Sequence, residues 1–209
     1  MNIGFSKLAR MADVVEFGDT SEYDETLVGR MEAVLKTPGR KLIILHIRGS
    51  HEPPGNNYPA AMRKFSGDIR EDDYYDDSIH YTDYVIGKIF KALENRRASV
   101  LYYSDHALIR VKTFGKWVYK HAVGHAKKEA AEIPMWIWWA DKSKAQRLGT
   151  VEDLYCTEEN YNLVRDWLGI KTKDASAPSP LTSGWKSKGD YPVWISNSKA
   201  TRFGELDRE

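Results

Sequence analysis

Residues 98–106 read Ala-Ser-Val-Leu-Tyr-Tyr-Ser-Asp-His, and this stretch decides the fold class. Its first part is a short apolar run, which is typical of a strand buried in a sheet. The run ends in Asp105 and His106, whose side chains carry the chemistry of metal ligands. Ligands bind at the carboxyl ends of strands in α/β sheets. The stretch therefore predicts a sheet strand and a functional site directly after it.

Outward from this strand, helical and apolar segments alternate along the chain. Two more short apolar runs predict buried strands, at residues 41–47 and 134–139. Apolar residues at helical spacing predict helices over residues 24–35, 74–94 and 151–168. This alternation indicates an α/β fold with a mostly parallel sheet flanked by helices.

The helix expected over residues 74–94 has two kinds of side chain that the structure can test. An apolar stripe is expected to face the core, made of Ile79, Thr82, Val85, Ile86, Ile89, Phe90 and Leu93. Four aspartates lie near the helix start and are expected to act on the helix dipole: Asp72, Asp73, Asp76 and Asp77. The first helix, over residues 24–35, is expected to be capped by Thr20 or Ser21.

Composition excludes several classes of protein. The 209 residues carry 31 Lys and Arg against 30 Asp and Glu, a net charge of +1, which argues against a nucleic-acid binder. The single cysteine, Cys156, excludes an intramolecular disulfide and a Cys-rich zinc cluster. The sequence shows no 18-residue apolar run and no signal peptide at its start, so we expect a soluble chain without a transmembrane segment.

Three polar segments are candidates for one shared site. Asp105 and His106 can reach one metal ion where the chain turns, or they can simply form a capped turn with an exposed histidine. His51 follows the strand expected at 41–47, and His121 and His125 precede the strand expected at 134–139. Histidines bind metals, hold phosphoryl oxygens or transfer protons. We expect these segments to converge on one edge of the sheet.

Four stretches together resemble a known family. They are KLIILHIRGSHEPPGNNYP at 41–59, YYDDSIHYTDYVIGKIFKALE at 74–94, VLYYSDH at 100–106 and VGHAKKEAAEIPMWIWWAD at 123–141. In this order and with these gaps, the chain resembles the sulfatase-like catalytic domain of the phosphoethanolamine transferases, in the alkaline phosphatase superfamily. The resemblance covers roughly residues 20–141. It implies an α/β/α sandwich, in agreement with the alternation of helices and strands.

The resemblance also implies a chemistry and assigns residues to it. Asp105 and His106 match the pair that binds the catalytic zinc, while His51 and His125 match histidines that face the phosphoryl group or a second zinc. His121, in a Tyr-x-His setting, is the alternative to His125 because a related branch has its histidine in that context. In the family, a zinc-activated threonine takes phosphoethanolamine from a phospholipid headgroup. The group then passes to lipid A or the lipopolysaccharide core, at the periplasmic face of the inner membrane.

The chain departs from the family pattern before and after the site. The family's nucleophilic threonine and a metal-binding glutamate lie well before the His51 loop, and the nearest threonine here, Thr20, has a different context. The usual Gly-Glu after Ser-Asp-His is replaced by Ala107-Leu108, and the following segment is more basic than the family pattern. Cys156 lacks the sequence context of a sulfatase nucleophile, which favours the transferase branch.

These departures predict an N-terminally truncated relative. Residues 1–170 are expected to form a partial sulfatase-like catalytic domain, and residues 171–209 a C-terminal tail or arm. The alternative is a catalytically inactive fragment that binds a phosphorylated ligand or a partner. Because a missing segment leaves a sheet edge uncovered, we expect self-association or a complementing N-terminal fragment.

Overall fold

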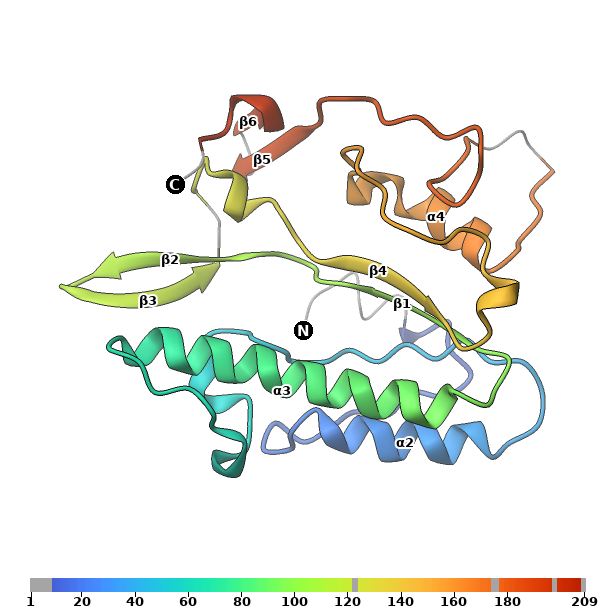
Figure 1. The fold of residues 1–209 in the computed structure, drawn as a ribbon, viewed down its shortest axis with the longest axis horizontal. Helices are drawn as coiled ribbons and strands as arrows, with labels where there is room; N and C mark the ends of the chain where they lie inside the picture. The colour runs from blue at the N-terminus through green and yellow to red at the C-terminus, as the bar shows by residue number, and fades with distance from the viewer. Residues whose placement is uncertain (1–8, 122–123, 174–176, 197–198, 208–209) are drawn as a thin grey trace. The chain divides into compact units, whose positions relative to one another are not determined.

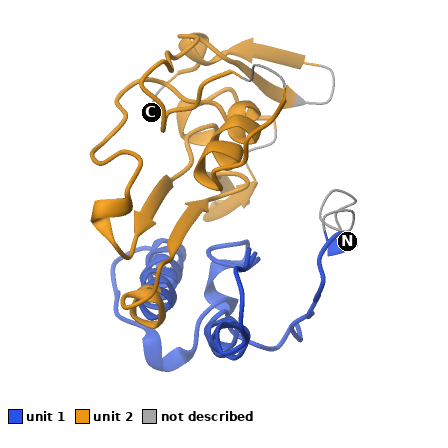
Figure 2. Cartoon of the chain, turned by 90° about the vertical axis from the view of Figure 1, so that its right-hand side faces the viewer, with its two compact units in different colours: residues 1–89 blue, residues 90–209 orange. Residues whose placement is uncertain are grey.

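A computed structural model describes residues 9–121, 124–173, 177–196 and 199–207. The chain forms two compact units, residues 1–89 and 90–209, coloured separately in Figure 2. Each unit is described below by itself. The division expected at residue 170 stays a prediction, and no described helix is long and apolar enough to cross a membrane.

The described residues of unit 1 include helices α2 (Glu25–Leu35) and α3 (Arg70–Leu93), and the last turn of α3 crosses into unit 2. The first helix agrees with the sequence prediction, although it begins after Asp24 and not after Thr20 or Ser21. The helices are joined by a hydrogen bond from the Glu25 amide to the Tyr81 hydroxyl, at 3.3 Å, and by an ion pair between Glu25 and Lys88. Two 3-10 turns lie between them, Pro54–Asn56 and Ala60–Met62.

The buried face of α3 contains most of the stripe expected from the sequence, since Thr82, Val85, Ile89 and Leu93 are buried and Ile86 and Phe90 are half-buried. Ile79 departs from the expectation at 41% exposed, and Asp77, Ser78 and Tyr81 are buried in addition. The helix begins four residues earlier than expected, which moves Asp77 into its second turn. The Asp77 carboxylate accepts hydrogen bonds from the amides of Lys64 and Phe65, at 2.7 and 3.1 Å. Asp77 therefore anchors the loop before the helix and does not act mainly on the helix dipole.

Residues 41–47 are extended, but the structure assigns no strand to them. Their side chains alternate between half-buried and exposed, and Leu42 and Ile44 are 58% and 53% exposed. The alternation is that of a strand with one exposed face, not that of the buried strand that the apolar run predicts. The described residues of unit 1 provide no strand to pair with it, so the prediction of a sheet strand here is wrong for this structure.

Among the described residues of unit 2, the strands form three two-stranded ladders, all antiparallel. Strand β1 (Ser99–Tyr103) pairs with β4 (Met135–Trp139), β2 (Leu108–Thr113) with β3 (Lys116–His121), and β5 (Pro192–Ser196) with β6 (Lys199–Arg202). Figure 1 shows the β2–β3 hairpin extending from the end of the β1–β4 pair. The expectation of mostly parallel pairing is corrected for these ladders. Parallel neighbours need a crossover, usually a helix, and the segment between β1 and β4 contains a hairpin instead.

Aromatic rings pack along the β1–β4 ladder. Tyr102 and Trp136 are cross-strand partners whose stacked rings have centroids 4.9 Å apart. On the same strand, Trp138 stacks on Phe90 with centroids 4.5 Å apart. Such pairs add to the stability that burial alone gives a two-stranded ladder. The two strands that the sequence predicts around residues 98–104 and 134–139 therefore pair with each other, although most of their side chains are half-buried and none is fully buried.

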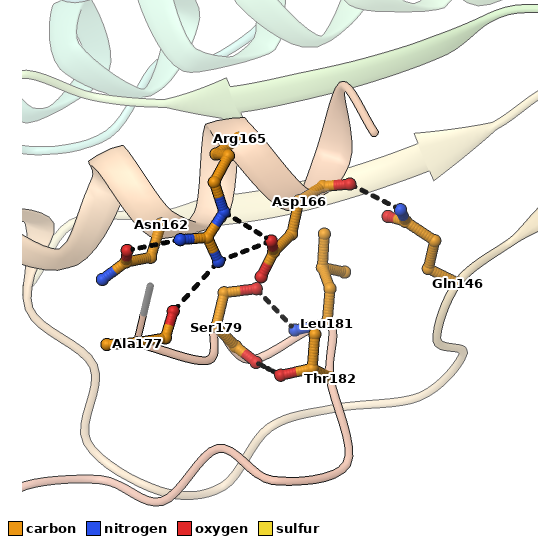
Figure 3. A network of polar contacts seen from close by, with 8 residues as sticks. All are labelled: Gln146, Asn162, Arg165, Asp166, Ala177, Ser179, Leu181 and Thr182. Atoms are coloured by element: carbon orange, nitrogen blue, oxygen red, sulfur yellow. Dashed lines mark hydrogen bonds and ion pairs between the residues drawn. The ribbon is translucent and has the colours of Figure 1, made fainter. Parts of the chain in front are cut away.

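The last helix, α4 (Asn160–Trp167), is shorter than the helix expected over 151–168 and follows a 3-10 turn at Thr157–Glu159. Its Arg165 side chain is 7% exposed and binds three partners, shown in Figure 3. The guanidinium donates to the Asp166 carboxylate at 2.6 and 2.8 Å, to the Asn162 amide oxygen and to the Ala177 carbonyl. The tail around Ala177 is thus held against α4. Shorter 3-10 turns lie at Lys128–Ala130, Lys142–Lys144 and Phe203–Glu205.

Candidate functional site

The Asp105–His106 pair lies in the turn that follows β1, where the sequence places it. The Asp105 side chain is 77% exposed, and its Oδ1 is 3.7 Å from Nε2 of His106. The Ser104 hydroxyl donates to the His106 carbonyl at 2.7 Å, and the Ser104 amide donates to the Pro134 carbonyl at 3.4 Å. These bonds hold the turn against the start of β4, so the backbone that carries the Asp105 and His106 side chains is fixed in place.

His121 lies beside this pair because of the register of the hairpin. Leu108 and His121 are the first partners of the β2–β3 ladder, directly after the turn that holds His106. The imidazole rings of His106 and His121 have centroids 4.1 Å apart and are tilted by 36°. The His106 side chain is one-third exposed. His106 thus lies beside a carboxylate, Asp105, and a second imidazole, His121, at the base of the hairpin.

His125 is placed differently. It is exposed and follows Gly124, whose φ of +89° suits glycine and whose amide donates to the Ile195 carbonyl at 2.9 Å. Within the described part of the chain, no hydrogen bond, ion pair or ring contact joins His125 to the Asp105–His106 pair. The choice between His121 and His125 stays open as a prediction, and the ring contact favours His121.

His51 belongs to unit 1, in a loop organised by a buried carboxylate. The Asp24 side chain accepts hydrogen bonds from the amides of Arg48 and Gly49, both at 2.8 Å. Gly49 has a φ of +56°, which a side chain would disfavour. The Asn57 side-chain amide donates to the His51 carbonyl, and the His51 ring nitrogen Nδ1 is 2.7 Å from the Glu52 carbonyl. The sequence indicates His51 but gives no signal for Asp24 as the residue that positions its loop.

The fit of these residues to a zinc ion is partial. Structural and catalytic zinc sites have three or four protein ligands. In the ranges that the structure describes, no group of three or more His, Cys, Asp or Glu side chains is placed to hold one metal ion. Asp105 and His106 can supply two ligands, and the described residues do not complete the set.

Comparison with known proteins places the chain among relatives. The family model described as Sulfatase matches residues 3–169. The putative transferase YhbX of Escherichia coli strain K12 is 38% identical over 151 residues, which are 71% of this chain and 28% of YhbX. The Kdo(2)-lipid A phosphoethanolamine 7''-transferase of Salmonella typhimurium is 28% identical over 133 residues, 57% of this chain and 23% of that protein. The chain therefore spans less than a third of the length of these curated relatives.

A solved structure shares the fold. The C-terminal periplasmic domain of EptC from Escherichia coli, in complex with Zn, matches with a TM-score of 0.75 at 19% sequence identity. The match covers 99% of this chain and 65% of that domain. At this identity the likeness shows the fold alone, and it confirms the α/β class and the alkaline phosphatase-like architecture that the sequence predicts.

Proposed function

The chain belongs to the sulfatase family, and from this premise we propose that it is part of a zinc-dependent phosphoethanolamine transferase. The observation that carries the proposal is that His106, directly after β1, lies beside both Asp105 and His121. In a member of this family, a carboxylate and imidazoles at a strand end suit the binding of phosphoryl oxygens and a metal ion. The relatives include proteins named as phosphoethanolamine transferases.

We assign roles to this chain's own residues as follows. Asp105 and His106 each contribute one metal ligand, with the remaining ligands supplied from outside the described residues. His51 and either His121 or His125 donate hydrogen bonds to phosphoryl oxygens, which neutralises charge that develops there. Asp24 positions the His51 loop through its two backbone hydrogen bonds.

The substrates and the location are proposals on the same ground. We propose a phospholipid headgroup as the donor and lipid A or the lipopolysaccharide core as the acceptor, because a relative is named for transfer to Kdo(2)-lipid A. We propose the periplasmic face of the inner membrane as the location, because the matching EptC domain is described as periplasmic. A second copy of the chain, or a complementing fragment, is proposed to complete the site.

Zinc binding by variants of the chain tests the proposal. We expect wild-type protein, equilibrated with zinc and dialysed, to retain about one zinc per chain, the number that one catalytic site holds. Asp105→Asn is expected to lose this zinc, while Asp153→Asn, which changes an exposed aspartate elsewhere in unit 2, is expected to keep it. Equal zinc content in the wild type and Asp105→Asn would refute the assignment of the metal ligands.

The pair His121→Ala and His125→Ala then identifies the site histidine. Both variants remove an imidazole from the same segment, so each is the control for the other. We expect His121→Ala to weaken binding of inorganic phosphate to the zinc-loaded protein by about tenfold, as for the loss of one charge-assisted hydrogen bond. His125→Ala is expected to bind as the wild type does. The reverse result would assign the role to His125.

A second candidate function is a non-catalytic module that binds a phosphorylated ligand. The observation that favours it is the incomplete set of metal ligands among the described residues. This candidate predicts phosphate binding that does not depend on zinc and survives Asp105→Asn. Titration calorimetry with inorganic phosphate, with and without zinc, separates it from the transferase.

A further inference from the structure

The β2–β3 hairpin has features that the proposed reaction does not use. Residues 107–128 contain Arg110, Lys112, Lys116, Lys120, Lys127 and Lys128, and no Asp or Glu. Four of these cations lie on the hairpin itself, between Leu108 and His121. In a chain whose net charge is +1, this is a strong local excess of positive charge. Such a cluster attracts anionic surfaces.

The tip of the hairpin exposes an aromatic side chain. Phe114 is fully exposed and lies in the two-residue turn between the partners Thr113 and Lys116. Phe114 and Gly115 both have positive φ, +49° and +79°, as in a type I′ turn. A phenylalanine is an unfavourable residue for this backbone and for full contact with water. Its position is explained if the tip contacts an apolar medium.

The charges surround the tip on both faces of the hairpin. Lys112 shares one face with its partner Trp117, whose ring is also covered by the Arg110 guanidinium at 4.1 Å from the centroid. Lys116 and Lys120 lie on the opposite face, and both are exposed. Cations on both faces are unsuited to a hairpin that lies flat with one face on a surface. They suit a hairpin that enters a surface with its tip first.

We propose that the β2–β3 hairpin docks the protein on an anionic lipid surface, with Phe114 inserted below the headgroups. Strands rise by about 3.3 Å per residue, so Lys112 lies about 7 Å behind Phe114, and Lys116, the partner of Thr113, lies about 3 Å behind it. Interfacial elements bury their apolar side chains by about 5–10 Å, which places these lysines among the anionic headgroups. The long lysine side chains adapt to this boundary. The aromatic tip favours a lipid over a soluble polyanion.

The docking rests on the proposed function for its purpose, which is to hold the candidate site near a lipid. The binding itself needs neither zinc nor catalysis. The six residue pairs of the hairpin separate its tip from the His106–His121 pair at its base by about 20 Å. A lipid surface bound at the tip would therefore keep the candidate site near a lipid substrate. Binding to vesicles can be measured without zinc and without catalysis, so a failure of the docking is distinguishable from a failure of the transferase proposal.

Flotation of the protein with lipid vesicles tests the proposal. We expect binding to vesicles of phosphatidylcholine with phosphatidylglycerol, weaker binding at high salt, and little binding to phosphatidylcholine alone. Replacement of Lys112, Lys116 and Lys120 by glutamine is expected to weaken binding about a hundredfold at low salt. The matched control replaces three exposed lysines elsewhere in unit 2, Lys142, Lys171 and Lys173, by glutamine. It is expected to bind as the wild type does.

Phe114→Asn separates insertion from simple charge attraction. Asparagine tolerates positive φ and suits a type I′ turn, so the hairpin is expected to stay folded. Loss of the inserted ring is expected to weaken vesicle binding about tenfold. Unchanged binding of Phe114→Asn would refute insertion and leave a charged surface for a soluble polyanion. Equal binding of the hairpin triple variant and its control, or no preference for phosphatidylglycerol, would overturn the proposal.

Discussion

At the scale of single residues, Glu159 shows how a buried charge holds the C-terminal part of unit 2. Its side chain is 7% exposed. The carboxylate accepts hydrogen bonds from the Tyr191 hydroxyl at 2.7 Å and the Trp185 indole at 3.1 Å, and its Oε1 is 3.1 Å from the Lys188 ammonium. Burial alone would raise the pKa of Glu159, but these three donors outweigh it and hold the pKa below the usual 4.5.

The lowered pKa predicts how the contribution of Glu159 to stability depends on pH. The unfolded state binds a proton more readily than the folded state, so the contribution is complete above about pH 4.5 and is lost as the pH falls through the lower folded pKa. Glu159→Gln introduces an amide among three donors. We expect it to lower the free energy of unfolding by about 2 kcal/mol at pH 7. Urea unfolding at pH 7 and pH 3 measures the difference, which should shrink at pH 3; a constant difference would contradict this account.

Single residues also show how far the sequence predicts the site. Asp105 and His106 could be identified because they directly follow an apolar strand. The approach of His121 to His106 depends on the hairpin register, which pairs Leu108 with His121, and the sequence analysis did not predict the hairpin. Asp24 and Asp77 act on backbone amides more than ten residues away. The residues around Asp24 and Asp77 in the sequence do not differ from those around an exposed aspartate. The sequence therefore gives no local sign of these long-range hydrogen bonds.

At the scale of elements, the loop that carries His51 depends on Asp24 for its conformation. Asp24→Ala removes an acceptor shared by two amides, and we expect the free energy of unfolding to fall by about 2 kcal/mol. Hydrogen exchange at the amides of Arg48 and Gly49 is expected to become faster. Asp19→Ala is the control, because the Asp19 carboxylate is exposed and bonds only within its own turn, to Ser21. If both variants were equally stable, Asp24 would not be a positioning residue.

The elements differ in how well the sequence predicts them. Helix α2 and strands β1 and β4 were predicted within a few residues, because their apolar runs and periodicity are strong. The β2–β3 hairpin was missed although its residues alternate, because Phe114-Gly115 lacks the Asn-Gly or Asp-Gly signature of a type I′ turn. The antiparallel pairing of β1 with β4 agrees with this hairpin, since the described residues between the two strands form no α-helix that could cross over the ladder.

At the scale of the whole molecule, the segment 41–47 has a strand's sequence, but none of the strands assigned among the described residues includes it. Its pattern predicts a sheet strand, yet pairing is a property of two segments and cannot be read from one. The solved EptC domain is larger than this chain, which matches 65% of it. Within the described residues, Leu42 and Ile44 stay more than half exposed on an extended backbone. An extended apolar segment of this kind is a template for pairing between chains.

Self-association through residues 41–47 is the prediction that follows. Two copies paired antiparallel about Ile44 would place each Ile44 opposite its counterpart and bury the exposed apolar face. We expect wild-type protein to form dimers or larger species as its concentration rises in sedimentation velocity. Ile44→Lys places a charge in this contact and should raise the dissociation constant of the dimer by at least tenfold, which shifts the distribution toward monomer. Ala33→Lys adds the same charge at an exposed position of α2 and should associate as the wild type does. A wild type that stays monomeric, or a response to both variants alike, would show that this segment does not join two copies.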